Sequence, residues 1–66
     1  MNTLRFEQDD EDYYILEGND LYGLIHSQGR DNFYIVWNDD DIKIPEHGLD
    51  NAIRYVRKHY KEHKPI

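Results

Sequence analysis

The fold of this chain follows from one stretch near its C-terminus, LDNAIRYVRKHYKEH at residues 49–63. Apolar side chains recur in this stretch with helical spacing, at Leu49, Ala52, Ile53, Val56 and Tyr60. At about 100° per residue, these positions share one side of a helix. Gly48 can act as a weak N-cap, and Pro65 stops the helix. We therefore predict an amphipathic helix over residues 49–63.

Upstream of the helix, clusters of turn-forming residues divide the chain into short strand-like segments. The pattern predicts strands at about residues 4–8, 13–17, 21–27 and 33–38, with residues 42–44, ended by Pro45, as a candidate fifth strand. The connections are too short for parallel crossovers, so the strands should form an antiparallel meander. The predicted fold class is α+β. It is a single domain spanning residues 1–66, with a meander sheet of four or five short strands and one C-terminal helix packed on one face.

The composition excludes several classes of function. Cysteine is absent, which removes disulfides, a thiolate nucleophile and cysteine-based zinc sites. A secreted domain of 66 residues usually needs disulfides, and no N-terminal apolar run is present, so we expect a cytoplasmic protein without a membrane partner. A chain of this size also has little room for a deep substrate cavity.

Motifs for catalysis and metal binding are weak. Ser27 follows His26, but neighbouring strand residues point to opposite faces, so the two cannot form a nucleophile–base pair. Neither acidic run of the chain fits the spacing of a calcium-binding loop. His59 and His63 have the spacing of two zinc ligands on a helix, but Tyr60 replaces the glutamate of the metalloprotease motif. We therefore expect a non-catalytic protein with no metal and no cofactor.

The net charge of −6 is distributed unevenly along the chain. Residues 1–50 contain 13 acidic and 3 basic residues, a net −10, whereas residues 51–66 contain 5 basic and 1 acidic residue, a net +4. The meander places two acidic runs in turns at opposite ends of the sheet: Asp9, Asp10, Glu11 and Asp12, then Asp39, Asp40 and Asp41. Such carboxylates either attract a basic protein or keep the turns solvated, and the sequence leaves both readings open.

Carboxylates spaced along a rigid sheet can imitate the phosphates of a nucleic acid and attract a basic groove. In size, charge and lack of cysteine, the chain resembles the small inhibitor proteins found among phages and mobile elements, which block nucleases or other nucleic-acid enzymes. The resemblance lies in size and charge and involves no motif. It implies a basic partner protein that processes nucleic acid. The leading hypothesis is therefore a small acidic binding protein that acts as a nucleic-acid mimic.

A first alternative is a nucleic-acid-binding or regulatory module that uses the basic side of the helix. That side carries Arg54, Arg57, Lys58 and Lys61. These cations could contact phosphate, although the acidic remainder of the chain repels a polyanion. They could equally balance the domain's own acids through local pairs such as Asp50–Arg54 and Lys58–Glu62.

A second alternative is an assembly domain that uses an aromatic sheet face. Residues 33–37 are apolar or aromatic throughout, so both faces of this strand are apolar, and one helix can cover only one of them. The expected interface contains Tyr14, Tyr34 and Trp37. It would be covered by a second copy in a homodimer or by another protein, unless the tyrosines simply face water.

Overall fold

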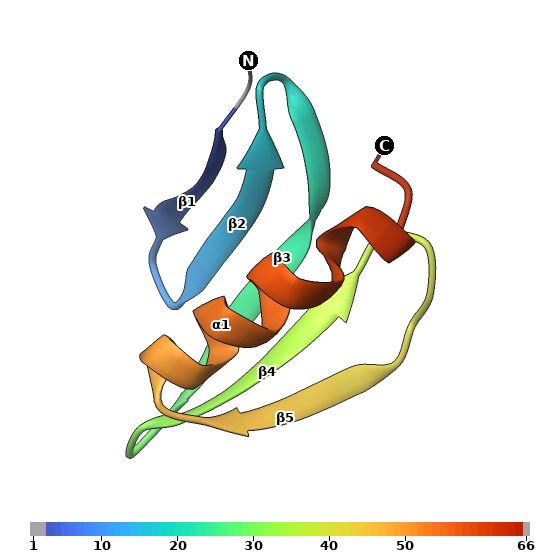
Figure 1. Ribbon diagram of the computed structural model, residues 1–66. Helices are drawn as coiled ribbons and strands as arrows, with labels where there is room; N and C mark the ends of the chain where they lie inside the picture. Colours follow the sequence, from blue (N-terminus) through green and yellow to red (C-terminus); the bar gives the residue numbers. More distant parts are fainter. Residues whose placement is uncertain (1–2, 66) are drawn as a thin grey trace.

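The computed structural model describes residues 3–65 and places a five-stranded sheet against one helix (Figure 1). The elements in chain order are β1 (Leu4–Asp9), β2 (Asp12–Glu17), β3 (Asp20–Gly29), β4 (Asn32–Trp37), β5 (Lys43–His47), α1 (Leu49–His59) and a 3₁₀ turn, η1 (Tyr60–Glu62). Each strand pairs antiparallel with the next, in the order β1-β2-β3-β4-β5. The predicted meander and C-terminal helix are confirmed.

The fifth strand is longer than the sequence suggested. It covers Lys43–His47 instead of residues 42–44, and Pro45 lies inside it instead of ending it. Proline is tolerated there because β5 is an edge strand, where the missing N–H need not bond to a neighbour. Among residues 3–65, no helix is long and apolar enough to cross a bilayer.

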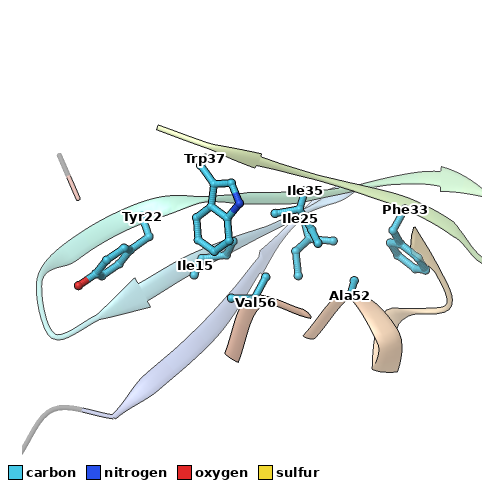
Figure 2. Close-up of a cluster of buried hydrophobic side chains, with 8 residues drawn as sticks. All are labelled: Ile15, Tyr22, Ile25, Phe33, Ile35, Trp37, Ala52 and Val56. Carbon is cyan, nitrogen blue, oxygen red and sulfur yellow. The ribbon is translucent and has the colours of Figure 1, made fainter. Parts of the chain in front are cut away.

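The core lies between α1 and the face of the sheet that α1 covers. Side chains from β2, β3 and β4 point toward the helix in Figure 2, with Ile15, Ile25 and Ile35 fully buried. The helix contributes Ala52 and Val56, also fully buried, so the predicted apolar side of the helix does face the sheet. Burial of each large aliphatic side chain is worth about 1.5–3 kcal/mol.

Trp37 belongs to this core, so its predicted place on an exposed sheet face is wrong. Its side chain is 0% exposed because it lies on the same side of β4 as Phe33 and Ile35, the side that faces the helix. The indole ring also stacks on the His63 ring, with centroids 4.1 Å apart and planes 7° from parallel. The C-terminal segment therefore covers the end of β4.

The helix is shorter than predicted. α1 ends at His59, and one 3₁₀ turn replaces the last turn of the expected helix over residues 49–63. Tyr60 secures this end by donating a hydrogen bond from its hydroxyl to Glu17 Oε2 at 2.7 Å. That hydrogen bond raises the pKa of Tyr60 above its ordinary value of 10.0.

A bulge in β3 brings a further aromatic side chain into the core. Ile15 pairs with Gly23 but Leu16 pairs with Leu21, so Tyr22 is the extra residue. Its ring meets the Tyr60 ring edge to face, with centroids 5.3 Å apart. Gly23 follows directly, at a point where β3 and β4 approach closely, and a Cβ there would collide with the carbonyl oxygen of Val36.

We predict that Gly23→Ala lowers the free energy of unfolding by about 3 kcal/mol or more, because the methyl group must push β3 away from β4. Gly29→Ala is the matched control. Gly29 has a φ of 83° but no atom within 4 Å of the added Cβ, so only left-handed backbone strain of about 1–2 kcal/mol applies. Urea denaturation of both variants measures the difference. Equal losses would contradict the close approach at Gly23.

Candidate functional site

Two turns at one end of the sheet expose a group of carboxylates. The β1–β2 turn, the β3–β4 turn and the start of α1 all lie at this end (Figure 1). We name as the acidic end the four exposed carboxylates of the two turns: Asp9, Asp10, Glu11 and Asp31. None of the four forms an ion pair with any other residue of the described range 3–65.

The backbone fixes both turns to ordered elements. The Ser27 N–H donates to the Glu11 carbonyl at 2.8 Å, which joins the first turn to β3. The Gly48 N–H donates to the Asp31 carbonyl at 2.6 Å, which joins the second turn to the start of α1. Arg30 and Asp31 both have positive φ, 55° and 63°, as a tight hairpin turn of type I′ requires. The acidic end is therefore held in place by local geometry.

Asp12, the fourth residue of the first predicted run, does not belong to this group. Its side chain lies on the face of the sheet away from α1, where His26 Nδ1 donates to Asp12 Oδ1 at 2.6 Å. The His26 ring also packs against the Tyr34 ring, at 4.9 Å between centroids. Asp12 is thus engaged within the sheet, and within the described part of the chain the first run offers three unpaired carboxylates instead of four.

The second predicted run lies at the opposite end of the sheet, beside the C-terminal segment. Asp39 accepts hydrogen bonds from His63 Nδ1 at 2.8 Å and from the Lys64 backbone N–H at 3.2 Å. The bond from His63 is the main cause that lowers the pKa of Asp39 below its ordinary value of 3.8. Asp40 accepts from the Ile42 N–H at 3.1 Å, and Asp41 is exposed. Asp39 therefore ties the C-terminal segment to this end of the sheet, and its carboxylate is already engaged by hydrogen bonds.

A cation could be held at this second end. One ligand atom from each of Asp39, Asp40 and His63 lies within 4.8 Å of the others. Asp39 and His63 are already hydrogen-bonded to one another. The pair of zinc ligands suggested by His59 and His63 does not form, since His59 Nδ1 contacts Glu62 at 3.2 Å instead.

The predicted basic residues lie on α1 and, for Lys61, on the 3₁₀ turn that follows it. Arg54, Arg57, Lys58 and Lys61 are all exposed. The local pairs predicted for them are wrong: Arg54 donates to Asn51 Oδ1 at 3.2 Å, and Glu62 contacts His59. Within the described residues none of the four joins an ion pair. The helix cations are therefore not balanced by nearby acids in direct contact.

Two hollows of the described surface are open to solvent. One of about 460 Å³ lies at the start of α1, and another of about 370 Å³ lies between β5 and α1. The first is lined by Asp31, His47, Gly48, Leu49, Asp50, Asn51 and Arg54. Neither contains a nucleophile beside a base, the arrangement that nucleophilic catalysis requires.

Comparison of the chain with protein-family models, with curated proteins and with solved structures finds no match. Of the predicted interface residues, Tyr14 and Tyr34 lie half-buried on the sheet face away from α1, and Trp37 does not. The contacts His26–Asp12 and His63–Asp39 join residues 14 and 24 positions apart, and no local sequence pattern predicts them.

We predict that Asp39 contributes to the loss of folding stability at acidic pH. Its pKa is lowered in the folded state, so its contribution is complete above the unfolded value and is lost as pH falls through the folded pKa. Asp39→Asn should therefore flatten the decline of the unfolding free energy below about pH 4. Asp41→Asn, an exposed neighbour, is the control. Urea denaturation across this range tests it, and an unchanged slope in Asp39→Asn would contradict the prediction.

Proposed function

We propose that this chain is a small non-catalytic binding protein that recognises a basic surface of another protein through its acidic end. The observation that supports this most directly is the state of the four carboxylates Asp9, Asp10, Glu11 and Asp31. They are exposed, and no cation among residues 3–65 is paired with them. Their charge is therefore available to a partner.

The rigidity of the two turns favours binding. A flexible acidic tail would lose conformational freedom on association, at a cost of about 0.5–1.5 kcal/mol for each side chain that becomes ordered, and more for its backbone. In this chain the backbone of both turns is already fixed by hydrogen bonds from Ser27 and Gly48. Only the carboxylate side chains remain to be ordered by the partner.

The overall charge supports the same class of partner. At −6 the chain attracts basic proteins over roughly a Debye length, about 8 Å at physiological salt, and raises the rate of encounter. Grooves that bind nucleic-acid phosphate are the basic surfaces that such a cluster of carboxylates fits best. We therefore favour a nucleic-acid-processing protein as the partner, with the chain acting as an inhibitor that occupies the groove in place of nucleic acid.

A second candidate function is direct contact with nucleic acid through Arg54, Arg57, Lys58 and Lys61. The observation that favours it is that these four cations, three on α1 and Lys61 on η1, are exposed and form no ion pair within the described chain. The net charge of −10 in residues 1–50 opposes it. Binding of duplex or single-stranded DNA at low salt would favour this candidate over the first.

We predict that a Lys- and Arg-rich peptide, used as a probe of basic surfaces, binds the acidic end in preference to the other acidic run. In an NMR titration of the labelled chain, the largest shift changes should fall on Asp9, Asp10, Glu11 and Asp31. The triple variant Asp9→Asn, Asp10→Asn, Glu11→Gln should bind about tenfold more weakly, since each exposed ion pair contributes about 0.2–1 kcal/mol.

The matched control neutralises three carboxylates at the opposite end: Asp20→Asn, Asp40→Asn and Asp41→Asn. It removes the same net charge, so a loss equal to that of the triple variant would mean that only total charge matters, and the proposed site would be wrong. A sharper measurement uses a nuclease with labelled duplex DNA. The chain should displace the DNA at low salt, and the triple variant should displace it about tenfold less well.

A further inference from the structure

The sheet face away from α1, named here the open face, carries one row of residues that crosses all five strands. The register pairs Glu7 with Tyr14, Tyr14 with Leu24, Leu24 with Val36, and Val36 with Lys43. Because paired residues in a sheet point to the same side, these five side chains form a line across the face. The line has an acid at the β1 edge, three apolar side chains at the centre and a base at the β5 edge.

Further apolar side chains flank this row. Leu16 and Leu21 form the neighbouring cross-strand pair on one side, and Tyr34 pairs with Pro45 on the other. The central side chains of the face are half-buried by one another. Figure 1 shows α1 lying on one side of the sheet, and no other described segment lies over the opposite side. A contiguous apolar centre of this kind usually marks an interaction site.

Most polar side chains around the apolar centre are already matched within the face; among the described residues, Asp9, opposite Asp12 at the acidic end, is an exception. His26 is bonded to Asp12 at 2.6 Å, the Arg5 guanidinium contacts Glu7 at 2.7 Å, and Lys43 Nζ lies 5.0 Å from the centre of the Tyr34 ring. Burying the face therefore leaves few polar groups without a partner. Its charges also nearly cancel, unlike those of the acidic end.

We propose that a second copy of this chain covers the open face, with a two-fold axis running along β3. Rotation about that axis keeps the position of each row along the strand direction and reverses the order of the strands across the sheet, so that β1 lies over β5 of the other copy. Leu24 then meets Leu24 of the partner subunit, and Tyr14 meets the partner's Val36. Glu7 meets the partner's Lys43, and Lys43 meets the partner's Glu7. The row is thus complementary to its own reversed copy.

Charge selects a second copy over other occupants. A uniformly basic protein would meet Arg5 and Lys43 on this face, and a uniformly acidic one would meet Glu7 and Asp12. Only a partner with a base opposite Glu7 and an acid opposite Lys43 avoids both kinds of charge repulsion. A second copy of the chain supplies that pattern. Packed sheets lie about 10 Å apart with strands within about 30° of alignment, a gap that long Glu and Lys side chains can span.

This dimer is independent of the proposed function, but it affects how the acidic end is displayed. An axis along β3 keeps the strands of the two copies running in the same direction, so both acidic ends lie at the same end of the dimer. The carboxylates of the two turns of both copies would then face one partner together, with Asp9 at the margin of the covered face, whereas an axis across the strands would place them at opposite ends.

The experiment is sedimentation velocity across a concentration series, with circular dichroism to check folding. We expect a species of twice the 8.0 kDa chain mass. Leu24→Glu places two carboxylates against each other on the axis, so it should weaken the dimer at least about a hundredfold. Arg57→Gln, on the outer side of the helix, is the matched control: it makes the same change in net charge and should leave the mass unchanged.

Charge reversal at the two edges keeps the test decisive even if Leu24→Glu fails to fold, because Glu7 and Lys43 are exposed. Glu7→Lys or Lys43→Glu alone should weaken the dimer about tenfold, since each puts like charges together twice. The double variant should restore wild-type affinity. A chain that stays monomeric up to millimolar concentration would overturn the proposal. So would a dimer in which the double variant is no tighter than the single ones.

Discussion

The packing of α1 across β4 is the contact on which the rest of the structure depends. Ala52 and Val56 press against the side of β4 that holds Ile35, and this one choice divides the sheet into two unlike faces. The side that meets the helix becomes the core, and Val36 is left on the other side. The same packing brings the start of α1 beside the β3–β4 turn, where Gly48 bonds to Asp31.

Much of this architecture could be predicted from the sequence, because its signals are local. Helical spacing from Leu49 to Tyr60 and short connections between strands are enough for the meander and the helix. The face occupied by Trp37 could not be predicted, since residues 33–37 are all apolar and lack the alternation that identifies the buried side. In the structure Ile35 pairs with Ile25, and both are fully buried. Trp37, two residues further along β4, therefore lies on the same buried side.

The candidate site divides in the same way. The sequence alone located both acidic runs, but it could not separate carboxylates without a partner from those that are hydrogen-bonded. Asp39 and Asp12 are each hydrogen-bonded to a histidine far away in the chain, whereas Asp10 and Glu11 have no such partner among residues 3–65. Such long-range pairs depend on where the strands and the chain end meet, and no spacing rule describes them. The two runs therefore look alike as sequence and differ as surfaces.

The stack of His63 on Trp37 gives the molecule an optical property. Trp37 is the chain's single tryptophan, so all indole emission arises from one buried ring against one imidazole. Intrinsic fluorescence thus follows the attachment of the C-terminal segment to β4 without any label. Release of that segment becomes visible as a spectroscopic event separate from unfolding of the sheet.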